Sequence, residues 1–133
     1  MHRSTRRVAR LGALVLVLAC APEPTTPAST NLGGIWKSDA HVFGLTQFKL
    51  TLIQESGGIV SGEWYVRTDG GVGDCPPRTA CEAFGNLIGW NTVSQVELEL
   101  LGAGKFEGAL VEPNRLRGIF IVSAGSDTIT FVK

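Results

Sequence analysis

Apolar and polar residues alternate along most of this chain, and that alternation limits the fold more than any other feature. Phe48, Leu50 and Leu52 are separated by polar residues, and the same period of two recurs in 96–100 and 116–122. Successive side chains of a β-strand point to opposite faces, so this period is typical of half-buried strands. No segment shows a convincing helical period. The sequence therefore predicts an all-β domain.

Glycine-rich and asparagine-containing turns divide the pattern into eight short segments in simple meander order. They are 33–38, 48–52, 60–66, 85–90, 96–100, 106–110, 116–122 and 129–131. Eight antiparallel strands are enough to close a small up-and-down β-barrel, filled by side chains or holding one small ligand. The alternative is a two-sheet β-sandwich with glycines at bulges.

Three segments carry a glycine between two inward-facing apolar positions, at Gly62, Gly108 and Gly118. Glycine inside a strand normally lowers stability, so its repetition needs a reason. Tight coiling or close approach of backbones in a small barrel would supply one.

The first 19 residues have the parts of an export signal. Arg3, Arg6, Arg7 and Arg10 precede an apolar run, 11–19, that is only nine residues long. A helix that spans a bilayer needs about 20 residues, so this run directs export and does not span. We expect residues 1–19 to be a signal peptide.

The apolar run ends on a cysteine, in the stretch Val17-Leu-Ala-Cys20. This stretch resembles the lipobox of bacterial lipoproteins, in which the cysteine thiol takes a diacylglycerol before the signal is cut. The resemblance implies that Cys20 carries acyl chains such as palmitate and holds the protein on a membrane of the bacterial cell envelope, facing the periplasm or the cell exterior. Two or more chains give stable anchoring, at about 0.8 kcal/mol per buried methylene. The alternative is an ordinary cleaved signal with a chance cysteine.

Residues 20–31 contain several prolines and threonines and little that could be buried. Extended at about 3.1 Å per residue, such a tether could hold a folded part roughly 30 Å from the membrane. The first apolar residue of the folded part is Leu32, so we expect the β-barrel domain at 32–133.

Cys75 and Cys81 enclose a short proline-containing loop in the one long break between strands. In an oxidising envelope we expect a disulfide between them, which leaves Cys20 as the odd cysteine. A redox-active pair is the alternative, although the spacing differs from the thioredoxin type.

No residue set amounts to a catalytic centre or a metal site. His41 is the only histidine after Cys20, and no nucleophile motif accompanies it. The formal charge is +4 before Cys20 and −4 after it, which argues against nucleic acid as a partner. We therefore expect a protein that is not an enzyme and has no cofactor.

Several short motifs resemble avidin and streptavidin. Gly34-Ile-Trp36 is similar to the G-x-W that opens small calycin barrels, in which the tryptophan packs across the closed end. Val60-Ser-Gly-Glu-Trp64, Gly89-Trp90 and Gly125-Ser-Asp-Thr-Ile-Thr130 are similar to later avidin segments. The resemblance implies that ring-contacting aromatic residues stand at Trp90 and Phe120, that Trp64 replaces a tyrosine, and that a ureido-binding aspartate stands at Asp127.

The chain also departs from that family. Ser38, Val42 and Val66 stand where avidins use other groups to hydrogen-bond biotin. Unpaired polar groups in a dry pocket cost about 1–3 kcal/mol each, so we expect no tight biotin binding.

Two functions of different classes follow. In the first, the barrel encloses a cavity that binds a small apolar ligand, with Trp36, Trp64, Trp90, Phe120 and Asp127 as the candidate ligand-binding residues. In the second, side chains fill the barrel, which serves as a structural or protein-interaction module of the envelope. The volume of the interior distinguishes them.

Overall fold

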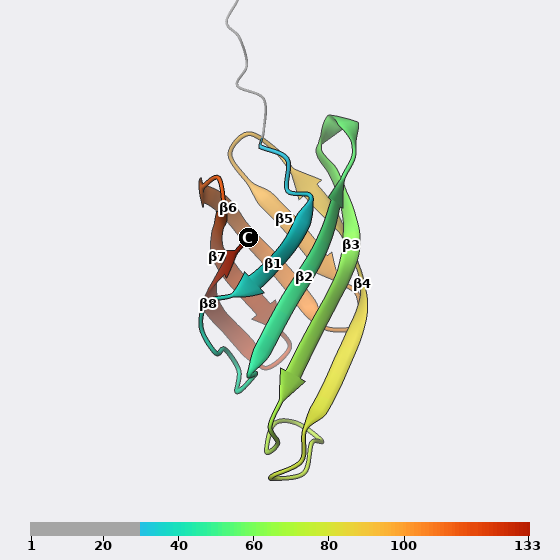
Figure 1. Ribbon diagram of the computed structural model, residues 1–133, viewed down its shortest axis with the longest axis vertical. Helices are drawn as coiled ribbons and strands as arrows, with labels where there is room; N and C mark the ends of the chain where they lie inside the picture. Colours follow the sequence, from blue (N-terminus) through green and yellow to red (C-terminus); the bar gives the residue numbers. More distant parts are fainter. Residues whose placement is uncertain (1–29) are drawn as a thin grey trace, which may run out of the picture.

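The computed structural model describes residues 30–133, and in this part of the chain eight antiparallel strands close into one barrel in sequence order (Figure 1). The predicted all-β up-and-down barrel is therefore confirmed, and the β-sandwich alternative is wrong. The strands are β1 (Gly34–Ser38), β2 (Gln47–Gln54), β3 (Ile59–Thr68), β4 (Cys81–Asn91), β5 (Val96–Leu100), β6 (Gly104–Glu112), β7 (Arg115–Val122) and β8 (Gly125–Val132).

Each strand pairs with its neighbours in the chain, and β1 closes the barrel against β8, with Lys37 opposite Val132 and Ser38 opposite Phe131. A short 3-10 turn, Ser56–Gly58, joins β2 to β3. The pairing of β6 with β7 shifts register between Leu110 and Glu112, which is typical of a β-bulge at the rim of a barrel.

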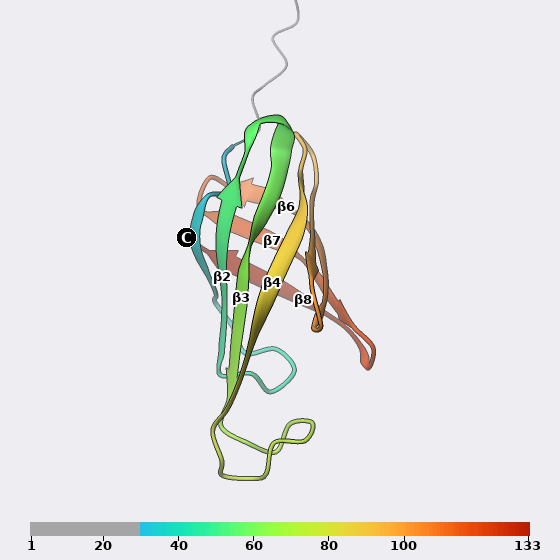
Figure 2. The ribbon, with the colours of Figure 1, turned by 90° about the vertical axis from the view of Figure 1, so that its right-hand side faces the viewer.

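The barrel has two distinct ends. Segment 30–33 leads into β1 at one end, together with the β2–β3, β4–β5 and β6–β7 turns; we call this the tether end. The opposite, loop end carries the β1–β2 and β3–β4 loops. Figures 1 and 2 show β3 and β4 running on past the rest of the barrel at the loop end as a two-stranded ribbon.

Strand β4 is longer than the sequence indicated. We expected it at 85–90, whereas it begins at Cys81 and ends at Asn91. Its first residues pair with the end of β3, Thr68 lying opposite Cys81. These residues lack a clear apolar alternation because they form the projecting ribbon, where both faces are largely in water.

The inward-facing glycines allow the close approach of neighbouring backbones that their spacing indicated. Gly108 and Gly118 lie directly opposite each other on β6 and β7. A Cβ atom on Gly118 would lie 2.6 Å from the Cα atom of Gly108. The two backbones approach so closely that no side chain fits between them.

Candidate functional site

Aromatic rings fill the barrel interior in a continuous chain of edge-to-face contacts. The ring centroids of Phe106 and Phe131 lie 5.7 Å apart, those of Phe131 and Phe48 5.1 Å apart, and those of Phe48 and Phe120 5.0 Å apart. Such spacing is that of rings in direct contact. All four side chains are buried, so these rings form the central part of the barrel core.

The loop end is closed by the β1–β2 loop. Val42 is buried there, and the ring of Phe43 packs against Phe120, with centroids 6.0 Å apart. Phe43 and Gly44 both have positive φ, which turns the loop sharply over the end of the barrel. Thr68 on β3 fixes the loop by donating a 3.1 Å hydrogen bond from its hydroxyl to the Gly44 carbonyl.

The tether end is closed by segment 30–33. Leu32 is fully buried, and the indole Nε1–H of Trp36 donates a 2.7 Å hydrogen bond to the Leu32 carbonyl. Lys133 places its Nζ 5.5 Å from the Trp36 ring centroid. Trp36 thus lies at the tether end of the barrel, tied to segment 30–33.

The five candidate ligand-binding residues do not line one cavity. Trp36, Trp64 and Phe120 are buried inside the barrel, but Trp90 is 53% exposed on the outer surface. The expected inward position of Trp90 is therefore wrong. On β4 the inward residues are Leu87, Gly89 and Asn91, so the alternation of the strand puts Trp90 outside.

Asp127 lies opposite Phe120 in the pairing of β7 with β8, at the loop end of the barrel. It is exposed, and its carboxylate accepts a 2.8 Å hydrogen bond from the backbone N–H of Thr128. Phe43 and Phe48 pack against the Phe120 ring. Asp127 is thus at the rim and not in an enclosed pocket, and a ligand-binding role for it stays a prediction.

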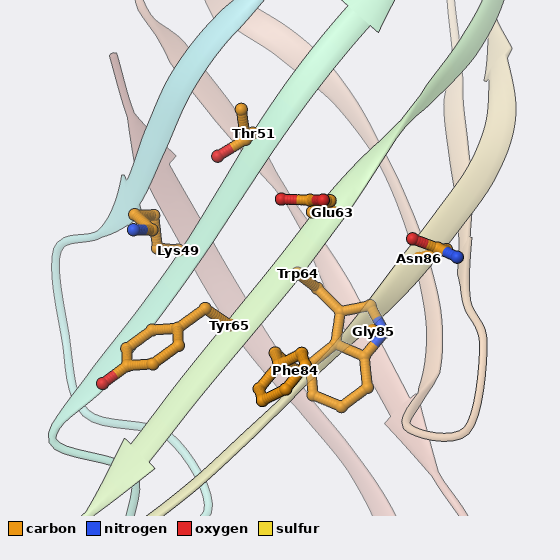
Figure 3. A pocket seen from close by; sticks show the side chains of 8 residues that line it. All are labelled: Lys49, Thr51, Glu63, Trp64, Tyr65, Phe84, Gly85 and Asn86. Carbon is orange, nitrogen blue, oxygen red and sulfur yellow. The ribbon is translucent and has the colours of Figure 1, made fainter.

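A cleft of about 540 Å³ lies on the outer wall of β2, β3 and β4 (Figure 3). We call it the outer-wall cleft. It combines aromatic rings with polar side chains of both charges and was not predicted from the sequence. Its lining residues are Lys49, Thr51, Glu63, Trp64, Tyr65, Phe84, Gly85 and Asn86.

Gly85 explains how an inward-facing tryptophan can reach this cleft. Trp64 on β3 lies opposite Gly85 on β4, and a Cβ atom on Gly85 would be 2.7 Å from the Trp64 Nε1 atom. The indole therefore occupies the space that a side chain at position 85 would take. Its Nε1–H donates a 3.2 Å hydrogen bond to the carbonyl of Leu101, which fixes the ring beneath the wall.

Phe84 and the half-buried Tyr65 form the outer aromatic part of the outer-wall cleft. They lie opposite each other on β4 and β3, and Phe84 is 80% exposed. The Tyr65 hydroxyl donates a 2.7 Å hydrogen bond to Glu82, and Lys49 Nζ lies 5.2 Å from the Tyr65 ring centroid. The hydrogen bond to the Glu82 carboxylate raises the pKa of Tyr65, because it favours the protonated phenol.

Carboxylates dominate the neighbouring wall of β5 and β6. Glu97 and Glu107 lie directly opposite each other, and Glu99 lies opposite Lys105. Lys105 Nζ is 2.7 Å from a Glu107 carboxylate oxygen. That hydrogen bond is the main cause that raises the pKa of Lys105, and the charges of Glu107, Glu97 and Glu99 add to it.

The disulfide between Cys75 and Cys81 is present, as the sequence predicted. It closes a seven-residue loop at the tip of the β3–β4 ribbon. The chain folds back there because the N–H of Gly71 donates to the Cys75 carbonyl and the N–H of Cys75 donates to the Val72 carbonyl, both at 3.0 Å.

His41 is exposed in the β1–β2 loop. Within residues 30–133 no three His, Cys, Asp or Glu side chains gather as metal ligands would. The same residues include no helix of the length and apolarity needed to cross a bilayer. Cys20, the predicted signal peptide 1–19 and most of the predicted tether lie outside the described residues.

The strand order and the pairing of β1 with β8 define a closed eight-stranded antiparallel up-and-down β-barrel, consistent with a calycin-like fold. No family model, no curated protein and no solved structure matches this chain.

Proposed function

We propose that this protein is a lipoprotein of the bacterial cell envelope, anchored by acyl chains on Cys20, whose barrel is a protein-interaction module. Two observations support the anchor. The apolar run of the signal ends on Cys20, and the disulfide between Cys75 and Cys81 accounts for the other two of the three cysteines. Structural disulfides are typical of oxidising compartments outside the cytosol, which agrees with export.

The observation that carries the proposed mode of action is the filled interior. Phe48, Phe106, Phe120 and Phe131 contact one another in the barrel, and Trp36 and Phe43 lie at its two ends. A small apolar ligand would have to displace these rings. The binding surface is therefore on the outside of the barrel.

The outer-wall cleft has the composition of a protein contact. Aromatic residues are enriched where partners meet, and an exposed ring surrounded by polar groups is a common anchor. Phe84 and Tyr65 supply the rings, and Lys49 and Glu63 supply charges of both signs at the border. The partner is an envelope protein that inserts side chains between these groups.

Mass spectrometry of membrane fractions tests the anchor. We expect a mature chain that begins at Cys20 and carries acyl chains. The Cys20→Ala variant leaves the rest of the chain intact and should appear without acyl mass. Recovery of the wild-type chain without acyl groups would contradict the proposal.

Site-specific photocrosslinking in living cells tests the contact. A photoreactive side chain at Phe84 should give one discrete adduct with an envelope protein. The control position is Thr128, exposed on the outer wall of β8. Adducts of equal yield at both positions, or none at Phe84, would exclude the outer-wall cleft as the contact.

Fluorescence distinguishes this function from ligand binding inside the barrel. In a Trp90→Phe variant only the buried Trp36 and Trp64 emit. We expect their emission to be unchanged by small apolar molecules and by biotin at millimolar concentration. Because Trp64 also lines the outer-wall cleft, a saturable shift that persists when Trp64 is replaced by phenylalanine would support the interior ligand site instead.

A further inference from the structure

Four large apolar side chains form an exposed patch on the outer wall of β2, β3 and β4. Ile59 and Trp90 lie directly opposite each other, and Ile53 and Ile88 lie on either side of Ser61. We call these four residues the apolar patch. Their exposed fractions run from 46% at Ile88 to 62% at Ile53. Large apolar side chains that are exposed together on one sheet surface mark an interaction site.

The apolar patch is at the tether end of the barrel. Ile59 is the first residue of β3 and Trp90 the next-to-last residue of β4. Asn91, the neighbour of Trp90, donates a 2.7 Å hydrogen bond from its side-chain amide to the carbonyl of Thr30. The chain therefore enters the barrel beside the patch, and exposed Val93 continues the apolar surface into the β4–β5 turn.

Only nine residues, 21–29, lie between Cys20 and Thr30. A proline-rich tether of that length reaches about 30 Å when extended and less when it is not. The acyl chains on Cys20 would thus keep the tether end close to the lipid surface. The surface nearest to the patch would be the membrane itself.

The chemistry of the patch fits the boundary between lipid headgroups and acyl chains. Tryptophan is enriched at that depth because its ring is apolar and its N–H is polar, and isoleucine gains from leaving water. Glu97 lies opposite Trp90 and Glu99 opposite Ile88, along the β5 border of the patch. These carboxylates favour zwitterionic over anionic lipid, because an anionic surface would repel them.

We propose that the apolar patch inserts into the surface of the membrane to which Cys20 is anchored, so that the barrel stands on its tether end. This inference rests on the proposed lipid anchor. Glu63 and Asn86, the next outward residues toward the loop end, are polar and limit the depth of insertion. The outer-wall cleft stays above the lipid, and the disulfide loop is farthest from the membrane.

Quenching of tryptophan fluorescence by lipids with brominated acyl chains tests the inference on the full lipidated protein in phosphatidylcholine vesicles. Trp36 and Trp64 are buried in the barrel, so Trp90, one of three tryptophans, is the residue that brominated chains can reach. We expect the wild-type protein to lose an appreciable part of the emission that Trp90 contributes. The emission of the Trp90→Phe variant should fall only by the small background quenching of the buried Trp36 and Trp64.

The matched control moves the exposed tryptophan away from the patch. In the double variant W90F/F84W the new indole lies on the same face of β4, six residues or about 20 Å toward the loop end. We expect no quenching of this indole. A third variant, Ile59→Ser, keeps Trp90 and should weaken its quenching, because the apolar area that drives insertion is smaller.

Flotation of the vesicles separates the inference from the anchor on which it rests. Protein that floats with the vesicles but shows no quenching at Trp90, or equal quenching at positions 84 and 90, overturns the inference and leaves the anchor standing. Protein that does not float overturns both. Quenching that disappears as the protein density in the vesicles rises would show that a second copy covers the patch, which also contradicts insertion.

Discussion

The side-chain amide of Asn91 lies 2.7 Å from the backbone carbonyl of Thr30 and donates a hydrogen bond to it. The same amide nitrogen lies 2.9 Å from the side-chain oxygen of Gln54. That oxygen also accepts a hydrogen bond from the backbone N–H of Leu32. One buried polar group on β4 therefore joins the start of the domain to β2 and closes the tether end.

Replacing the buried Asn91 by alanine should destabilise the domain by about 1–3 kcal/mol, because the Thr30 carbonyl and the Gln54 side-chain oxygen each lose a hydrogen bond at the tether end. The measurement is the urea concentration at the midpoint of unfolding, monitored by far-UV circular dichroism. Asn86→Ala is the matched control, since Asn86 is on the same strand but exposed on the outer wall. Equal loss of stability in both variants would contradict a special role for Asn91.

Asn91 and Trp90 also show where sequence reasoning about β4 failed. The inward face of this strand carries Gly85, Gly89 and Asn91, while its outward face carries Phe84 and Trp90. Apart from the buried Leu87, the large apolar residues of β4 are thus on its outward face, the reverse of what is expected for a half-buried strand. Gly85 has no side chain because the Trp64 indole fills that space, and such a relation between strands is not visible in one strand alone.

The rest of the barrel could be predicted because each strand's pattern agrees with its place. On β2, Phe48, Leu50 and Leu52 are all buried, as their spacing indicated. The disulfide between Cys75 and Cys81 could also be predicted, from the short loop that they enclose and from the oxidising compartment that the export signal implies. The outer-wall cleft could not, since it combines outward side chains of three strands whose registers the sequence does not reveal.

Gly118→Ala tests the close approach of β6 and β7. The new methyl group would meet the backbone of Gly108, 2.6 Å away, and backbone cannot move aside as a flexible side chain can. Such overfilling costs about 1–3 kcal/mol. Thermal unfolding should show the loss, whereas Ser126→Ala, at an exposed position of β8, should unfold like the wild type. An unchanged melting temperature for Gly118→Ala would contradict the observed approach.

Removing the disulfide should lower the stability of the domain without unfolding the barrel. A loop of seven residues restricts the unfolded chain little, and the entropy model gives about 2 kcal/mol for its closure. The double variant C75S/C81S should therefore keep the barrel's circular dichroism spectrum and unfold at a lower urea concentration. A protease should also cut the β3–β4 loop faster in this variant than in the wild type. Loss of the folded state in this variant would show that the ribbon supports the barrel more than its contacts indicate.

Tyr65 is the only tyrosine in the chain, so the absorbance of its phenolate at alkaline pH reports this residue alone. The hydrogen bond to Glu82 raises its pKa above the ordinary value of 10.0. A raised pKa in the folded state means that the contribution of this pair to stability is full below pH 10 and is lost as the pH rises through the pKa of the folded protein. In Glu82→Gln the pKa should return toward its ordinary value, because the negative acceptor is gone. The control is Glu63→Gln, which removes an outward carboxylate on the same strand and should leave the pKa of Tyr65 unchanged. If the pKa of Tyr65 is the same in the wild type and in Glu82→Gln, the hydrogen bond to Glu82 is not the cause of the shift.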